Sequence, residues 1–240
     1  MKYILSLIIV FLCISCGNKK ELLLPEIDKA EINEITDVSA AYLFYDETQP
    51  DSVELNRKNL ISTTNWLVNV DKRLTLKQAI PHIKFLQDKK KSSSHKNEKA
   101  KNYFTCHDLS ENNLGFIEFT SIEYYQNLDT LFNRDHTKSK NLSWEILIHA
   151  KTKDSISIDF PSNESGNMTS YIYSRQKNLQ TNLKNIISDS ISDFIKNRKV
   201  IIYLGCVENL KFQDYISLKF KLNQFDIKNT EISNKEFIYN

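Results

Sequence analysis

One stretch in the second half of the chain most constrains its fold. Apolar residues recur at helical spacing between residues 179 and 194, and an apolar run, residues 200–204, follows after a short polar link. The spacing predicts a helix with one buried face, and the run predicts a buried strand. The residues of the helical face are Leu179, Leu183, Ile186, Ile187, Ile191 and Phe194. A helix that leads into a buried strand is typical of mixed α/β folds.

The segments around this pair are predicted to be strands, with one ambiguity. Residues 144–150 and 155–160 are apolar and alternating, which indicates two paired strands, and residues 237–239 indicate a short closing strand. Residues 214–225 fit two periods. Ile216, Leu218, Phe220 and Leu222 alternate as in a strand, whereas Tyr215, Leu218, Leu222 and Phe225 also follow a helical face. Periodicity alone favours the strand.

In this order of elements, Leu210-Lys211-Phe212 forms an apolar-x-aromatic turn after the buried strand. The second half thereby resembles the periplasmic domain of ExbD/TolR-type biopolymer-transport proteins. The resemblance implies a helix over residues 212–224, against the alternation, and a closing strand after it. Members of that family also carry a transmembrane helix with an acidic residue that serves proton flow, and this chain has instead an apolar start of signal-peptide length. The resemblance therefore implies a role in envelope contacts without energy transduction.

The first half shows a similar order of elements. Residues 40–45, 66–70, 103–106 and 115–125 are predicted strands, the last two forming a hairpin. Thr75 with Gln78 three residues later fits a helix capping box. Pro81 implies either a kink in this helix or a helix that begins at Pro81. The lysine- and serine-rich residues 89–101 are predicted to form a loop, and residues 40–125 are a candidate diverged copy of the second half.

The first sixteen residues have the layout of an export signal that ends in a cysteine. A basic start precedes an apolar run of roughly ten residues, too short to span a membrane. Ser15-Cys16-Gly17 then resembles a bacterial lipoprotein box, which implies cleavage after residue 15 and lipidation of Cys16. Cys13 departs from that pattern, where Leu or Val is usual. A plain secreted protein is the alternative, and residues 16–38 are predicted to form the anchor and a polar tether.

Mixed α/β architecture in two small units is therefore the predicted fold class, each unit being a sheet with one or two helices packed on it. Polar residues 133–141 mark the boundary, which gives units 39–132 and 142–240. We expect the second unit to fold alone. Two cysteines, Cys106 and Cys206, remain in these units, and each ends an apolar run. A disulfide between them and two separate buried thiols are the alternatives, of which we favour the thiols.

Composition excludes several classes of function. Removal of Lys2 with the signal leaves 31 basic against 30 acidic residues, so no electrostatic surface for nucleic acid is indicated. Four glycines in 240 residues exclude glycine-rich phosphate loops, and we expect no nucleotide or other cofactor. The histidines lack the spacing of a zinc site. They are His82, His95, His107, His136 and His149.

The remaining candidates for chemistry also have simpler structural interpretations. Cys106-His107-Asp108 places a thiol beside an imidazole, but neighbouring side chains on a strand point to opposite faces. Asp46-Glu47 lies in turn-rich sequence and is expected to be solvated. A lysine run would touch anionic lipid headgroups or cell-wall polymer, or form a solvated loop. The run is Lys89, Lys90, Lys91, Lys96, Lys99 and Lys101, and candidate binding aromatics are Tyr124, Tyr125, Phe132, Tyr171 and Tyr173.

The sequence thus favours a lipid-anchored cell-envelope protein that acts as a non-enzymatic binding or assembly module and faces the periplasm or the exterior. Its expected partners are the membrane, through the lipid anchor, and envelope proteins or cell-wall polymer, with no catalytic residue or metal indicated. A lipid-anchored periplasmic hydrolase with an unrecognised site is the alternative. Convergence of titratable side chains in a deep pocket would favour the hydrolase.

Overall fold

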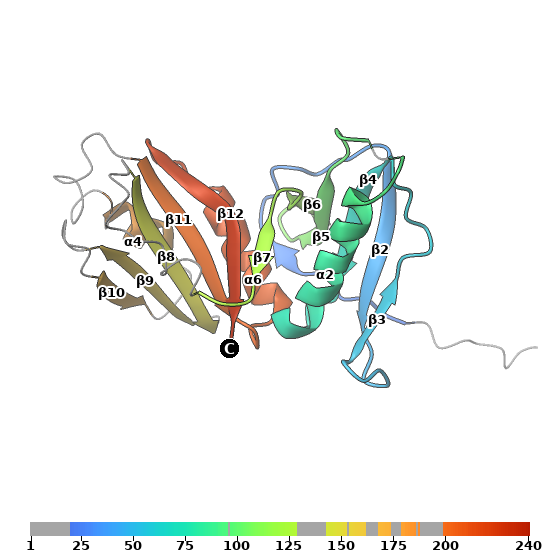
Figure 1. The fold of residues 1–240 in the computed structure, drawn as a ribbon, viewed down its shortest axis with the longest axis horizontal. Coiled ribbons are helices and arrows are strands. Elements are labelled where there is room, and N and C mark those ends of the chain that lie inside the picture. Colours follow the sequence, from blue (N-terminus) through green and yellow to red (C-terminus); the bar gives the residue numbers. More distant parts are fainter. Residues whose placement is uncertain are drawn as a thin grey trace, which may run out of the picture.

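The computed structural model describes residues 20–95, 97–128, 143–152, 154–161, 168–173, 179–185, 187 and 199–240. The predicted signal peptide and the lipidation residue Cys16 lie outside these ranges, as does the predicted helix after residue 187 up to Phe194. The described chain forms two six-stranded sheets and three helices, which confirms the mixed α/β class in two small units. Figure 1 shows the sheets side by side along the longest axis of the molecule.

The first sheet has the order β1-β5-β4-β2-β3, with β6 paired to β5. Its parallel pairs are β2 with β4, β4 with β5 and β1 with β5, and its antiparallel pairs are β2 with β3 and β5 with β6. The strands are β1 (Glu26–Ile27), β2 (Val38–Tyr45), β3 (Val53–Asn56), β4 (Asn65–Val70), β5 (Asn102–Asp108) and β6 (Asn113–Glu118). Helix α2 (Leu76–Lys91) connects β4 to β5.

The second sheet has the order β10-β9-β8-β11-β12-β7. Neighbours β8 and β11, β11 and β12, and β12 and β7 are parallel, and the pairs of β9 with β8 and β10 are antiparallel. The strands are β7 (Glu123–Tyr125), β8 (Ser143–Thr152), β9 (Ser155–Pro161), β10 (Met168–Tyr173), β11 (Lys199–Val207) and β12 (Thr230–Tyr239). The helices are α4 (Leu179–Asn185) and α6 (Phe212–Asn223), and α6 connects β11 to β12.

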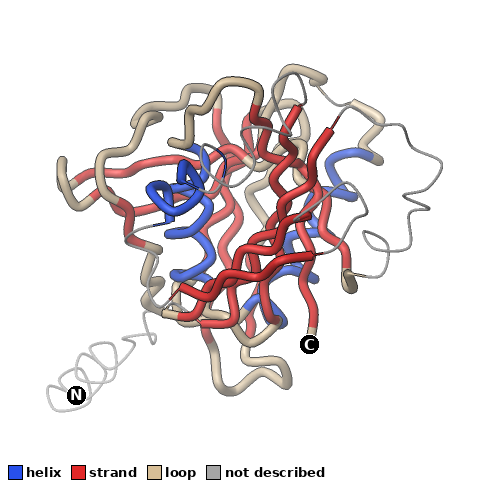
Figure 2. Tube along the Cα trace, turned by 90° about the vertical axis from the view of Figure 1, so that its left-hand side faces the viewer, coloured by secondary structure: helices blue, strands red, loops and turns tan. Residues whose placement is uncertain are grey.

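The two halves share a central plan. Each contains an antiparallel hairpin, a later strand parallel to the first strand of the hairpin, then a helix and a further parallel strand, and in the second half β10 and α4 lie in sequence between the hairpin and the later strand. The equivalent parts are β2-β3-β4-α2-β5 and β8-β9-β11-α6-β12. The two halves therefore repeat one arrangement of elements, and one continuous hydrophobic core runs through both of them. Figure 2 shows the strands and helices of both halves in a view turned by 90° from that of Figure 1.

Helix α2 begins where the sequence predicts. Thr75 accepts a hydrogen bond from the backbone N–H of Gln78, and the Gln78 side chain accepts one from the Thr75 N–H at 2.9 Å. This reciprocal cap satisfies donors that the first turn leaves free, so the helix starts before Pro81 and continues through it. It ends at Lys91, so Lys89, Lys90 and Lys91 belong to the helix and not to the predicted loop.

Helix α6 resolves the ambiguous segment in favour of the helix. Its buried residues recur at helical spacing, so the strand prediction from alternation is wrong and the helix implied by the family resemblance is confirmed over this segment. The buried residues are Phe212, Tyr215, Ile216, Leu218, Lys219 and Leu222. Burial of Lys219 explains the misleading pattern, because a charged side chain counts as exposed in any sequence-based alternation.

Two short strands depart from the predicted boundaries. Residues 16–38 were expected to form a tether, but β1 pairs with His107 and Asp108 of β5 and buries Ile27. A Cβ on Gly115 would lie 2.8 Å from Ile27 Cδ1, so the bare glycine permits this close approach. Strand β7 falls within the predicted first unit, 39–132, yet pairs with β12 of the second sheet. Two- and three-residue strands carry too little periodicity to be predicted.

Candidate functional site at the junction of the two halves

The two helix-starting turns pair with each other at the centre of the molecule. Thr75 and Lys211, the residues before α2 and α6, form an isolated antiparallel bridge. The Leu76 N–H donates to the Leu210 carbonyl at 2.9 Å, and the Phe212 N–H donates to the Leu74 carbonyl at 2.7 Å. These reciprocal bonds relate the two turns by a local twofold axis. The first helical N–H groups of both helices are thereby satisfied by the opposite half.

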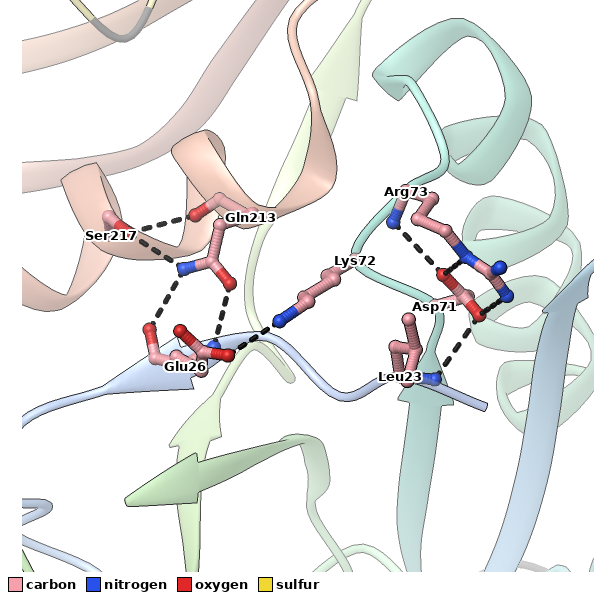
Figure 3. A network of polar contacts seen from close by, with 7 residues as sticks. All are labelled: Leu23, Glu26, Asp71, Lys72, Arg73, Gln213 and Ser217. Atoms are coloured by element: carbon pink, nitrogen blue, oxygen red, sulfur yellow. Dashed lines mark hydrogen bonds and ion pairs between the residues drawn. The ribbon is translucent and has the colours of Figure 1, made fainter. Parts of the chain in front are cut away.

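A buried carboxylate stabilises the turn before α2. Asp71 is fully buried and accepts hydrogen bonds from Arg73 Nε at 2.9 Å, Arg73 Nη2 at 2.7 Å and the Arg73 N–H at 3.0 Å, together with the Leu23 N–H at 3.2 Å (Figure 3). Burial alone would raise the pKa of Asp71, but these donors outweigh it and hold the pKa below its usual value. Asp71 therefore fixes both the turn and the N-terminal segment that crosses it.

Gln213 of α6 holds β1 of the other half. Its Oε1 accepts the Glu26 N–H at 2.8 Å, and its Nε2 donates to the Glu26 carbonyl at 2.9 Å (Figure 3). Ser217 Oγ is 3.0 Å from the same Nε2, and Lys72 Nζ pairs with the Glu26 carboxylate at 2.5 Å. The Gln213 side-chain amide thus bonds to both backbone groups of Glu26, as a neighbouring strand would. These two bonds anchor β1 to the second half.

Helix α2 makes the corresponding contact with the second sheet. Lys84 Nζ donates to the Tyr124 carbonyl at 3.0 Å, and Gln87 Nε2 donates to the Ile122 carbonyl at 3.0 Å. Both carbonyls belong to the β7 segment, which pairs with β12. The helix of each half therefore binds a strand segment of the other half's sheet.

A chain of polar side chains lies buried where α6, β7 and β12 meet. Lys219 Nζ and Glu236 Oε1 are 2.6 Å apart, and their side chains are 6% and 4% exposed. Tyr215 donates its hydroxyl to Glu236 Oε2 at 2.6 Å, and the Tyr124 hydroxyl lies 3.1 Å from that of Tyr215. Burial and the nearby Glu236 carboxylate raise the pKa of both tyrosines. Every member of this chain has a polar partner, as a buried charge requires.

A groove of about 700 Å³ opens beside this junction. One wall is a face of α2, the other is β7 and Gln126, and residues near the end of β12 and after β11 complete it. Its lining is Leu76, Lys77, Ile80, Pro81, Lys84, Phe85, Asp88, Tyr124, Tyr125, Gln126, Glu208, Ile238 and Asn240. Phe85 is 46% exposed, and the Arg57 guanidinium lies 5.0 Å from its ring centre. A mainly apolar lining with a few polar groups is typical of a binding site.

Several charged groups of the groove are held in intramolecular contacts. Lys77 Nζ pairs with Glu208 Oε1 at 2.7 Å, and Lys84 donates to the Tyr124 carbonyl. The Tyr124 hydroxyl points into the buried chain with Tyr215. These contacts shape the groove walls and leave the apolar side chains to face an occupant. Sequence reasoning missed this site, although Pro81 and Phe85 are apolar residues that lie off the buried stripe of α2.

Cys106 and Cys206 are free thiols, and both are completely buried. They do not occupy equivalent positions, because Cys106 lies on β5, after α2, whereas Cys206 lies on β11, before α6. Burial raises the pKa of each thiol well above its usual value. The alternative of two separate buried thiols is therefore the one the structure has, and neither is an activated nucleophile.

The Cys106-His107-Asp108 cluster is divided between structural roles. His107 Nε2 contacts Asn112 Oδ1 at 3.2 Å. Asp108 accepts the backbone N–H groups of Lys29, at 3.0 Å, and Ala30, at 2.6 Å, and also the Ser110 hydroxyl at 2.8 Å. These bonds, led by the one from Ala30, lower the pKa of Asp108. The Asp108 carboxylate therefore holds the N-terminal segment in place, which is a structural role.

One residue of the lysine run is buried, although the whole run was predicted to be solvated or to touch lipid or polymer. Lys90 is buried, donates to the Lys101 carbonyl at 3.0 Å and to Asn102 Oδ1 at 2.9 Å, and lies 5.1 Å from the Trp66 ring centre. Burial lowers its pKa to about 8. Lys101 pairs with Glu118 at 2.7 Å and is exposed, as are Lys89, Lys91 and Lys99. Lys96, Phe132 and His136 lie outside the described residues, as do the side chains of Tyr171 and Tyr173.

A second polar arrangement, also missed from the sequence, lies on the second sheet. His149 Nε2 is 2.7 Å from Asp159 Oδ2, and His149 Nδ1 is 2.9 Å from the Tyr239 hydroxyl. Burial lowers the pKa of His149 against the opposing effect of Asp159, and burial raises the pKa of Tyr239 to about 12. These residues come from β8, β9 and β12, so only the strand register brings them together.

Neither a metal centre nor a membrane-spanning helix is present in the part of the chain that the structure describes. There, no three His, Cys, Asp or Glu side chains are grouped so that they could hold a metal ion. Among the described histidines, His82 Nε2 lies 3.0 Å from Asp51 Oδ2. No described helix is long and apolar enough to cross a bilayer.

Comparison with known proteins gives little further information. No protein-family model matches the chain, and no curated protein matches it. A solved structure from Bacteroides thetaiotaomicron, described as a protein with an actin-like ATPase fold and unknown function, aligns with 82% of this chain and 91% of its own at 12% identity. The TM-score of that alignment is 0.26, which is too low to support an argument about fold or function.

Proposed function

We propose that this protein is a lipid-anchored cell-envelope protein that acts as a non-enzymatic binding or assembly module through the groove between α2 and β7. The observation that carries the proposal is the groove of about 700 Å³ with an apolar lining, in which Lys77 and Lys84 already have intramolecular partners. Its predicted anchor is Cys16, and its predicted location is the envelope, facing the periplasm or the exterior.

The expected occupant is an apolar segment of another envelope protein. One wall presents the exposed apolar residues Pro81 and Phe85, which are four residues apart on α2 and suit a partner with apolar side chains. Gln126 on the facing wall supplies an amide that can hydrogen-bond to a peptide backbone. An apolar contact surface with a few polar groups is typical of transient protein–protein interfaces.

Site-specific photo-crosslinking tests this function. A photoreactive residue in place of Phe85, which lines the groove, should yield a discrete crosslinked protein in native envelopes. The matched control is Leu114 on β6, which is 45% exposed against 46% for Phe85 and lies outside the groove. Loss of the crosslink when Pro81→Arg is added would support the groove as the contact surface, because Pro81 lines the groove and is exposed. Equal crosslinking from both positions, or none from Phe85, would contradict it.

One observation favours the alternative of a lipid-anchored periplasmic hydrolase. Asp159, His149 and Tyr239 form a carboxylate, imidazole and hydroxyl in line, the order in which a base activates a nucleophile. If Tyr239 is activated, a fluorophosphonate should label it by forming an O–P bond with loss of fluoride, and His149→Gln should abolish the labelling. An unlabelled Tyr239 would leave the three residues a structural role between strands.

A further inference from the structure

The N-terminal segment joins the folded body very early in the chain. Lys20 Nζ lies 2.7 Å from Asp46 Oδ2 and also pairs with Glu54. Leu23 donates its N–H to Asp71 Oδ2 at 3.2 Å and accepts the Lys72 N–H at 2.8 Å. Pro25 is buried and accepts the His107 N–H at 2.8 Å. The chain is therefore bound to the first half from Lys20 onward, where a free tether was expected up to residue 38.

The distance from the predicted anchor to the body is consequently short. Lys20 is four residues after Cys16, and a fully extended chain of four residues spans at most about 14 Å. If the contacts of Lys20 open, Leu23 becomes the first fixed residue, and seven residues span at most about 25 Å. Neither length lets the protein turn freely above a bilayer.

The attachment point lies at one end of the molecule. Asp46 follows β2, and the turn from Asp46 to Ser52 leads into β3, which is the outermost strand of the first sheet. The second sheet begins beyond the junction with β7 and continues by five strand spacings to β10, a distance of about 24 Å. Figure 1 shows β3 and β10 toward opposite ends of the longest axis.

We propose that the lipid anchor holds the first half against the bilayer surface, with the β2–β3 turn toward the lipid headgroups, and keeps the second half away from the membrane. This proposal rests on lipidation of Cys16, which belongs to the proposed function. Lys20 pairs with two carboxylates of this end, Asp46 and Glu54, which reduces the negative charge that the turn presents to lipid phosphates. The outer strands of the second sheet then face the envelope space.

Quenching by spin-labelled lipid headgroups tests this orientation. Full-length lipidated protein carries a fluorophore at Gln49→Cys, in the β2–β3 turn, or at Ser170→Cys, on β10, and both positions are exposed. Cys106 and Cys206 are completely buried and should not react with the label. In phosphatidylcholine–phosphatidylglycerol vesicles we expect quenching to be about twofold or more stronger at position 49, because contact quenching falls steeply beyond the reach of the short tether.

Two further variants test whether the short tether causes the difference in quenching between positions 49 and 170. Insertion of about 20 Gly/Ser residues between Asn18 and Lys19 adds a coil of about 25 Å and should remove most of the difference. Lys20→Ala lengthens the tether from four residues to seven and should reduce the difference by a smaller amount. A difference that survives the insertion would overturn the tether as its cause.

The experiment also distinguishes this proposal from the anchor itself. Flotation with the vesicles and fatty-acid labelling that is lost in Cys16→Ser would show that the anchor is present. Equal quenching at the two positions in floating, labelled protein would then overturn the orientation alone. Protein that neither floats nor takes up the fatty acid would instead overturn the proposed lipid anchor.

Discussion

Helices α2 and α6 start from equivalent turns, yet each is stabilised in a different way. Helix α2 begins with a capping box between Thr75 and Gln78, which uses residues three apart in sequence. Helix α6 begins at Phe212, after Lys211, without a side-chain cap, and further along it buries Lys219 against Glu236 of the following strand. The comparison shows that equivalent turns can start a helix with a side-chain cap or without one.

The largest expected effect concerns the dependence of the second half on β7. The sequence predicts that residues 142–240 fold alone, but this fragment lacks Tyr124, which is buried against α6. A fragment of residues 119–240 should be more stable by about 3–5 kcal/mol, the usual effect of a buried aromatic side chain. Urea unfolding followed by circular dichroism measures the two free energies.

The control for these fragments is Tyr124→Ala in the longer one. Because the side chain is removed while β7 stays, its stability should fall close to that of residues 142–240. Equal stability of the two unsubstituted fragments would show that β7 adds nothing and that the second half is independent of the junction.

Removal of one member of the buried Lys219–Glu236 pair should lower the free energy of unfolding strongly, whereas replacement of both by apolar residues should not. Lys219→Met leaves the Glu236 carboxylate buried without its cation, and we expect a loss of about 3–5 kcal/mol in the free energy of unfolding. Lys219→Met with Glu236→Leu removes both charges and should recover most of that loss. Chemical denaturation of the wild type and the two variants measures the free energies of unfolding. A double variant as unstable as the single one would show that the unpaired Glu236 carboxylate is not the cause of the loss.

Helix α2 offers a pH test at its own buried lysine. Burial lowers the pKa of Lys90 from 10.5 to about 8, so between these pH values the unfolded chain binds more protons than the folded one. The free energy of unfolding should therefore rise with pH in this window, by up to about 3 kcal/mol. The difference between the wild type and Lys90→Met isolates this rise, because the buried thiols titrate alike in both. A pH-independent difference would mean that Lys90 keeps its usual pKa.

The smallest expected effect compares the two residues that precede the helices. Thr75→Ala removes a side-chain cap and should lower the free energy of unfolding by about 1 kcal/mol. Lys211→Ala removes no cap, only an exposed hydrogen bond to the Arg73 carbonyl at 2.8 Å, and should change it by less than about 0.5 kcal/mol. Thermal unfolding of both variants is sufficient. Equal losses would show that the two turns are capped alike after all.

The sequence predicts those parts of the fold that rest on local signals. The start of α2 follows from Thr75 and Gln78, and the buried strand β11 follows from its apolar run. Helix α6 needed the family resemblance, because Lys219 and the apolar residues around it imitate strand alternation until tertiary burial is known. The strand register that unites His149 with Asp159 and Tyr239 has no local signal at all.

The candidate site was not predictable for a related reason. Its walls come from α2 and β7, and β7 was assigned to the wrong sheet because three residues give no period. Gln213 and Glu26 are separated by 187 residues, so their contact depends on how the halves dock. Pro81 and Phe85 carried the local signal, because both are apolar residues beside the buried stripe of their helix.

The pairing of the two turns also bears on how such a molecule can change over time. In a symmetric dimer of identical chains, the same turn would lie on both sides of the twofold axis, and any substitution in it would appear on both sides at once. Here the two turns are the different segments Leu74–Leu76 and Leu210–Phe212 of one chain. Within one chain, each side accepts substitutions independently. Thr75 can therefore remain a helix cap while its counterpart becomes Lys211. In the same way α6 can acquire the buried Lys219–Glu236 ion pair, whereas the buried Lys90 of α2 bonds to the neutral oxygens of Lys101 and Asn102.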